Sequence, residues 1–142
     1  MDALTTGACN IAMGINALGA SQAGTYNIAM GKLALGAGNV DGNNNIAIGQ
    51  LALTAATSNI DNIAIGRSSM DALTSGACNI ALGLNALGAS TTGCRNVAIG
   101  DLAAGVGVTT GTNNVAIGNR AMEDLTTGLC SVAIGFYAAG GA

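Results

Sequence analysis

The hydrophobic positions of this chain follow one five-residue pattern that returns throughout its length. The pattern is a polar residue, an aliphatic residue, Ala, a second aliphatic residue and Gly. Successive copies start seventeen or eighteen positions apart, at Asn10, Asn27, Asn45, Asn62, Asn79, Asn96, Asn114 and Ser131. Such regular spacing is typical of a solenoid, in which each repeat forms one coil stacked on the coil before it.

The alternation of large and small residues within the pattern predicts a short β-strand, because successive side chains of a strand point to opposite faces. In the first copy, Ile11 and Met13 share one face. The opposite face carries Asn10, Ala12 and Gly14. We expect the larger side chains to fill the interior of the coil. The flat Ala/Gly face then suits the close approach of a neighbouring chain.

The rest of each repeat predicts two corners and a second strand. A small residue and a mostly apolar one follow each pattern, as in Ala17-Leu18, and we expect them to end a short second strand before a variable polar loop. A further corner is expected three residues before each pattern, at Gly7, Gly24, Gly42, Asn59, Gly76, Gly93, Gly111 and Gly128. Because Gly and Asn tolerate a left-handed backbone, we expect positive φ there and at the motif glycines.

The first position of the pattern predicts a ladder of amides. Strands in a stack lie about 4.8 Å apart, so equivalent side chains of successive coils can hydrogen-bond to one another. The expected ladder consists of Asn10, Asn27, Asn45, Asn62, Asn79, Asn96 and Asn114. We interpret it as structural rather than as a ligand site.

A longer repeat overlies the short one. Residues 1–21 match residues 70–90 almost throughout, so position 70 corresponds to position 1, four coils later. This indicates that a four-coil unit was duplicated. We therefore interpret residues 1–142 as a single β-solenoid region of eight coils, and expect it to be a segment of a longer fibre.

Composition agrees with a thin all-β coil. The chain is 50% hydrophobic but only 2% aromatic, so its apolar content consists of small and medium-sized side chains rather than those of a globular core. The net charge is −3 with four basic residues, which argues against nucleic-acid binding. No apolar run reaches the length of a membrane span, so no membrane insertion is expected.

The sequence offers little for catalysis. It has no His, which excludes Ser-His and Cys-His couples, and its adjacent carboxylates, Glu123 and Asp124, fall in a variable loop. The aliphatic residue at every sixth position that hexapeptide-repeat acyltransferases use is also missing. We predict that the chain is not an enzyme.

Three of the four cysteines are interpreted as structural. Cys9, Cys78 and Cys130 all directly precede the pattern, and we expect them to be small buried hydrophobes. Cys94 is shifted by one position, so its side chain should point away from that of Cys78. Without His or a close Cys pair, neither a metal site nor a cofactor is predicted.

The pattern also resembles repeats of known attachment proteins. Residues 131–135, Ser-Val-Ala-Ile-Gly, and their seven relatives resemble the repeat of YadA-like trimeric autotransporter adhesin heads. The longer form, residues 114–122 followed by 125–128, resembles repeats of phage tail fibres. The resemblance covers the whole chain and implies a left-handed parallel β-roll, three chains around one axis, and attachment to a cell surface. Two departures are that the adhesin head repeat is shorter than the repeat of this chain and that four cysteines are unusual in either family.

These observations together lead to one expected function and two alternatives. We expect a homotrimeric segment of an extracellular attachment fibre, with a phage tail fibre favoured by the longer period. A bacterial surface adhesin or extracellular filament is the first alternative. An ice- or crystal-binding solenoid is the second, since threonines such as Thr74 and Thr91 recur before the corner. The expected partners are the chain itself and a cell-surface glycan or protein receptor, contacted by Arg120, Phe136 and Tyr137.

Overall fold

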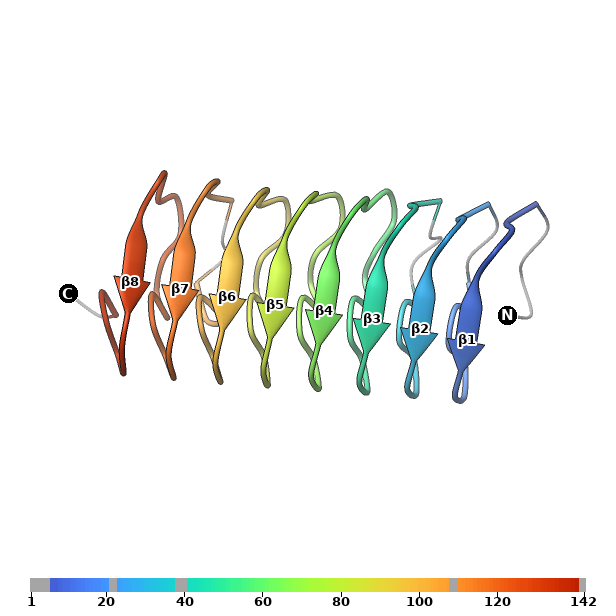
Figure 1. Ribbon diagram of the computed structural model, residues 1–142, viewed down its shortest axis with the longest axis horizontal. Helices are drawn as coiled ribbons and strands as arrows, with labels where there is room; N and C mark the ends of the chain where they lie inside the picture. Colours follow the sequence, from blue (N-terminus) through green and yellow to red (C-terminus); the bar gives the residue numbers. More distant parts are fainter. Residues whose placement is uncertain (1–5, 21–22, 38–40, 108–109, 141–142) are drawn as a thin grey trace.

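The chain forms a single stack of coils (Figure 1) in the computed structural model, which describes residues 6–20, 23–37, 41–107 and 110–140. Each repeat contributes one three-residue strand. The strands are β1 (Ile11–Met13), β2 (Ile28–Met30), β3 (Ile46–Ile48), β4 (Ile63–Ile65), β5 (Ile80–Leu82), β6 (Val97–Ile99), β7 (Val115–Ile117) and β8 (Val132–Ile134). They form one parallel sheet in chain order, and no described residue is helical. The prediction of an all-β parallel solenoid is confirmed.

The strands pair position by position. Ile46 lies beside Ile63, and Ala47 lies beside Ala64. The same register holds between β2 and β3 and between β6 and β7, where the repeat is one residue longer. The extra residue is therefore accommodated outside the paired positions, and each column of the sheet contains one kind of side chain.

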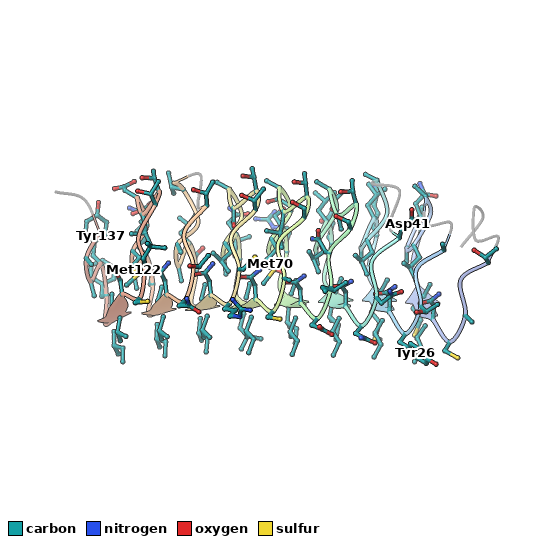
Figure 2. The ribbon with its side chains drawn as sticks, turned by 90° about the horizontal axis from the view of Figure 1, so that it is seen from above. Tyr26, Asp41, Met70, Met122 and Tyr137 are labelled. Atoms are coloured by element: carbon teal, nitrogen blue, oxygen red, sulfur yellow. The ribbon has the colours of Figure 1, made fainter. Side chains whose placement is uncertain are left out.

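The two faces of the sheet are oriented opposite to the prediction. The central Ala of the strands lies inside the coil, fully buried at Ala29 and Ala47, whereas Ile11 is 52% exposed and Met13 is 59% exposed. Figure 2 shows the side chains projecting from the strand row away from the coil. The expectation that the larger side chains fill the interior is wrong, and so is that of a flat Ala/Gly face toward a neighbouring chain.

The interior is instead filled from the opposite wall of the coil. Leu35, Leu53 and Leu87, which follow the small residue after each motif glycine, are at most 1% exposed. Because these side chains already occupy the thin space between the two walls, the facing strand can contribute only Ala and Asn. Burial of one Leu-sized side chain contributes about 2 kcal/mol, so this column supplies much of the apolar stabilisation.

This opposite wall is not the predicted second strand. It is a run of turns, in which the second and fourth residues after each motif glycine have positive φ, as at Leu51 (63°) and Leu53 (50°). The turns still stack like strands, because the Leu51 N–H donates to the Lys32 carbonyl at 3.0 Å and the Leu53 N–H donates to the Ser69 carbonyl at 3.0 Å. Backbone hydrogen bonds between successive coils therefore form in this wall without an extended conformation.

The corner residues also differ from expectation. Positive φ among the glycines falls on the motif glycines, for example 134° at Gly66, and on none of the eight expected corner residues, all of which are described. The prediction of positive φ at Gly7, Gly24, Gly42, Asn59, Gly76, Gly93, Gly111 and Gly128 is therefore wrong. Close stacking favours glycine at several of these corners. A Cβ on Gly76 would collide with the Gly93 carbonyl oxygen, and one on Gly111 would collide with that of Gly128.

Candidate functional site: an aliphatic sheet face and its two rims

The outer side of the sheet is an apolar surface that runs the length of the stack. We call it the aliphatic face, and it consists of the first and third residues of β1 to β8. Every one of these side chains is exposed or half-buried, whereas the Ala between them is buried in six of the eight strands at 1% or less. Exposure is greatest in β1 and β8, which have a paired strand on one side only, with Val132 at 69% and Ile134 at 67%. A contiguous apolar surface of this kind marks an interaction site in most proteins.

A row of exposed residues precedes the strands along one edge of this face. We call it the leading rim, and it comprises Cys9, Tyr26, Asn44, Asp61, Cys78, Arg95, Asn113 and Cys130. All eight have φ between 54° and 60°. Figure 2 shows Tyr26 on the same side of the molecule as the aliphatic face, and its side chain is 64% exposed. The leading rim therefore borders the aliphatic face.

A second row follows the motif glycines along the other edge. We call it the trailing rim, and it comprises Ile15, Lys32, Gln50, Arg67, Leu84, Asp101, Asn119 and Phe136. These residues are exposed or half-buried, with Ile15 at 71% and Phe136 at 79%. The two rims contain charged, amide, aromatic and thiol groups, whereas the aliphatic face between them contains only Ile, Val, Leu and Met.

The leading rim corrects the interpretation of the cysteines. Cys9, Cys78 and Cys130 are exposed, so the prediction that these three are buried hydrophobes is wrong. Cys94, which lies outside the rim, is half-buried. The error follows from the orientation of the strands. The prediction places the cysteines on the side of the large aliphatic residues, and that side faces outward.

The predicted receptor residues lie in the last two coils. Phe136 and Tyr137 have ring centroids 6.2 Å apart, and Tyr137 is 40% exposed. Arg120 holds the position equivalent to Tyr137 in the preceding coil, and its Nε lies 3.7 Å from Glu123 Oε1. The structure thus places Arg120 one coil from the aromatic pair and gives it a carboxylate partner. Receptor contact by these residues stays a prediction.

The asparagines of the pattern bind each coil to the next. Asn62 Oδ1 accepts the backbone N–H of Asn79 at 2.9 Å, and Asn62 Nδ2 donates to the carbonyl of Gly76 at 2.9 Å. Equivalent bonds run from Asn10 to the second coil and from Asn114 to the eighth. The asparagines from Asn27 to Asn114 are at most 3% exposed. Their side chains therefore satisfy backbone groups that the thin coil would leave buried without partners.

The corner position of the fourth coil differs from the others. Asn59 occupies it, is fully buried, and donates from Nδ2 to the carbonyl of Leu73 at 3.0 Å. Its Oδ1 has no partner among the described residues. The Asn59 side chain thus bonds to the carbonyl of Leu73 and is not part of the asparagine ladder.

Two threonines before the corner, Thr57 and Thr74, use their hydroxyls within the stack. Thr57 Oγ1 donates to the carbonyl of Thr74 at 2.7 Å, and Thr74 Oγ1 donates to that of Thr91 at 3.1 Å. These two hydroxyls thus contribute to stacking.

The described residues contain no pocket and no group of three or more His, Cys, Asp or Glu side chains placed to hold a metal. They also include no helix with the length and hydrophobicity of a membrane crossing. The extended surface formed by the aliphatic face and the rims is therefore the candidate site. Known protein families, curated proteins and solved structures give no match to this chain.

Proposed function

We propose that this chain is a structural and adhesive segment of an extracellular attachment fibre, with a phage tail fibre as the favoured setting and a bacterial surface adhesin or filament as the alternative. The observation that carries the proposal is the aliphatic face, an uninterrupted apolar surface along a regular stack. A stack of hydrogen-bonded coils supplies length and stiffness. An apolar side of constant chemistry allows such stacks to associate side by side.

The occupant of the aliphatic face is a second copy of the chain. Eight rungs at about 4.8 Å and a width of about 20 Å give roughly 750 Å², close to the area that each partner buries in a stable protein complex. A partner must present apolar groups at the same axial spacing along the whole length. Another copy of the chain has that spacing by construction.

Three copies fit the dimensions of the face. About six residues separate the rims, which gives a sheet width of about 20 Å. If three such sheets form the sides of a triangular prism, the axis lies about 6 Å from each sheet. This is near half of the roughly 10 Å spacing between packed sheets, the depth that Ile and Val side chains fill. We propose a parallel homotrimer with the left-handed winding that the repeat resemblance implies.

The proposed trimer changes one feature of the expected assembly. The Ala/Gly side of the strand lies inside each coil, so the axis of the trimer is lined by the aliphatic face instead. Burial of this face then supplies the hydrophobic driving force for association, at about 25 cal/mol for each Å² removed from water.

Sedimentation tests the assembly. In native buffer we expect about three chains per particle, and we expect Ile99→Asp, in the aliphatic face, to separate the chains while the far-ultraviolet circular dichroism is retained. A charge at the centre of the interface would be desolvated without a partner, which opposes association strongly. Asp124→Asn, at an exposed loop residue, is the control and should sediment like the native chain. A folded monomer at micromolar concentration would refute the proposal.

Adhesion is tested separately on cells. We propose that the exposed Phe136 and Tyr137 contact a surface glycan or protein, since aromatic side chains with a polar tip serve often as interface anchors. The double variant Phe136→Ala/Tyr137→Ala should lose cell binding and still sediment at about three chains per particle. Tyr137→Ala alone, which changes no rim residue, should weaken cell binding and sediment like the native chain. If the native segment attaches to no susceptible cell, the chain serves as a spacer only.

A further inference from the structure

The two rims match each other in chemical type, coil by coil. In the fourth coil the leading rim has Asp61 and the trailing rim has Arg67. In the sixth coil the signs are reversed, with Arg95 on the leading rim and Asp101 on the trailing rim. Both rims thus change sign between the same two coils, and no coil has like charges on its two rims.

The uncharged coils match as well. The third coil has the amides Asn44 and Gln50 on its two rims, and the seventh has Asn113 and Asn119. The first, fifth and eighth coils pair a thiol with an apolar residue, namely Cys9 with Ile15, Cys78 with Leu84 and Cys130 with Phe136. The second coil pairs Tyr26 with Lys32, an aromatic ring with a cation.

These matching residues do not meet within one chain. The members of each pair are six residues apart and lie at opposite ends of a strand, across the width of the aliphatic face. Within the described part of the chain, the one ion pair joins Arg120 to Glu123. The complementarity of Asp61 with Arg67 and of Arg95 with Asp101 is therefore left unused by the isolated coil.

We propose that the leading rim of one chain pairs with the trailing rim of the next, in register, at each corner of the assembly. This inference rests on the proposed self-association. When parallel chains surround a common axis, the edge before the strands of one sheet meets the edge after the strands of its neighbour. Asp61 then faces Arg67 of the next chain, and Arg95 faces Asp101.

The charge pattern also selects the axial register. A slip of two coils would bring Asp61 against Asp101, or Arg95 against Arg67, and like charges at an interface are strongly unfavourable. An antiparallel pair centred on the fifth coil would place Asp61 against Arg95 and Arg67 against Asp101. That arrangement leaves the first coil without a counterpart, whereas the parallel one matches all eight.

Charge reversal tests the pairing with substitutions that the fold already accepts. Asp61→Arg copies Arg95, which has the same rim position and nearly the same φ, 55° against 58°. Arg67→Asp copies Asp101 in the other rim. Either single variant puts like charges together at every interface, and we expect the concentration for half-dissociation to rise by at least about tenfold. The double variant Asp61→Arg/Arg67→Asp should return to within about threefold of the native chain.

Two further variants complete the experiment, which is sedimentation over a concentration series. Asp41→Arg is the matched control, because Asp41 is exposed on the side of the coil away from the strand row (Figure 2). It should associate like the native chain. Asp61→Arg/Arg95→Asp should remain impaired, since each of its new charges faces a like charge on the neighbouring trailing rim.

The outcomes separate this inference from the proposed function. If the chains assemble and the single reversals have no effect, the rim pairing is wrong and the assembly stands. Rescue by Asp61→Arg/Arg95→Asp instead of Asp61→Arg/Arg67→Asp would show an antiparallel pair and overturn the proposal. A native chain that stays monomeric would overturn both the assembly and the pairing.

Discussion

The two faces of each three-residue strand follow different rules. The inner position is Ala in every strand and is flanked by the asparagine ladder, whose polar atoms are hydrogen-bonded to the neighbouring coils. The outer positions vary among Ile, Val, Leu and Met and remain accessible to solvent. The uniform side is thus the one whose shape is fixed by stacking within the chain. On the variable side, only apolar character recurs.

The asparagine ladder allows the strongest test of the inner side. Asn79→Ala removes the acceptor of the Asn96 N–H and the donor to the Gly93 carbonyl, which both lie in buried surroundings. Each orphaned backbone group costs about 1–3 kcal/mol, so we expect the variant to lose about 4 kcal/mol of unfolding free energy. Equilibrium urea unfolding followed by circular dichroism measures this loss.

The exposed Asn119 supplies the control for that prediction. Its Nδ2 makes one long contact, 3.5 Å to Asp101 Oδ2. Asn119→Ala should change the unfolding free energy by less than about 0.5 kcal/mol when association is prevented by Ile99→Asp in the same chain. Equal losses in the two variants would contradict the structural role of the ladder.

The corner glycines provide the next largest expected effect. A Cβ at Gly76 would collide with the Gly93 carbonyl and would approach Leu73 Cδ1 to 2.7 Å. Overpacking of this kind costs about 3 kcal/mol, and the reduced freedom of the unfolded chain returns about 1 kcal/mol, so Gly76→Ala should lose about 2 kcal/mol. The same urea unfolding measurement checks it.

Gly135 separates crowding from backbone conformation. A Cβ there would meet only Ala138 Cβ at 4.0 Å, but φ is 126°. Gly135→Ala should therefore lose stability through strain alone, about 1 kcal/mol or more. If Gly76→Ala proved as stable as the native chain, the close stacking of the corners would be wrong.

Substitutions on the outer face of the strands should cost little unfolding free energy in a single chain. Ile80 is half-buried on the aliphatic face, so Ile80→Ala should lose only about 1 kcal/mol when association is prevented by Ile99→Asp in the same chain. In the assembled protein the loss should be larger, because the side chain is then covered. A loss of about 3 kcal/mol or more in the separated chain, the range of buried Leu→Ala changes, would place Ile80 in the interior and contradict the observed orientation.

The strands and their register could be predicted from the sequence, because the nearly constant spacing of the pattern leaves only one way to align Ile46 with Ile63. The side of the strand that faces inward could not. Alternation shows which residues share a face, as Ile11 and Met13 do, but it does not tell which face is enclosed. That depends on Leu18 and its equivalents, whose burial fills the coil from the other wall.

The rims show a different limit of prediction from the sequence. Their residues are visible in the sequence as variable positions, yet their pairing depends on which columns border the exposed face. If the aliphatic residues of the strand are assumed to face inward, Cys78 is placed in the interior. The pairing proposed for Asp61 at the edge of an exposed face is then missed. Backbone conformation is equally hidden, since a buried Leu with φ of 50°, such as Leu53, is uncommon outside a stack that imposes it.

The smallest expected effect concerns the wall opposite the strands, where Asp71 directly follows the buried Met70. Burial raises the pKa of Asp71 above its ordinary value of 3.8, partly offset by backbone hydrogen bonds at Asp71 and Ala72. Because the folded chain then favours the neutral carboxyl, this contribution to stability is fully present below pH 3.8 and is lost as the pH rises through the raised pKa. Asp71→Asn should remove this dependence and leave the variant slightly more stable than the native chain at pH 7. Urea midpoints measured from pH 3 to pH 7 on both chains, with the exposed loop variant Asp124→Asn as control, provide the comparison. If the stability difference between Asp71→Asn and the native chain does not change with pH, Asp71 is as well solvated as the residues of the rims.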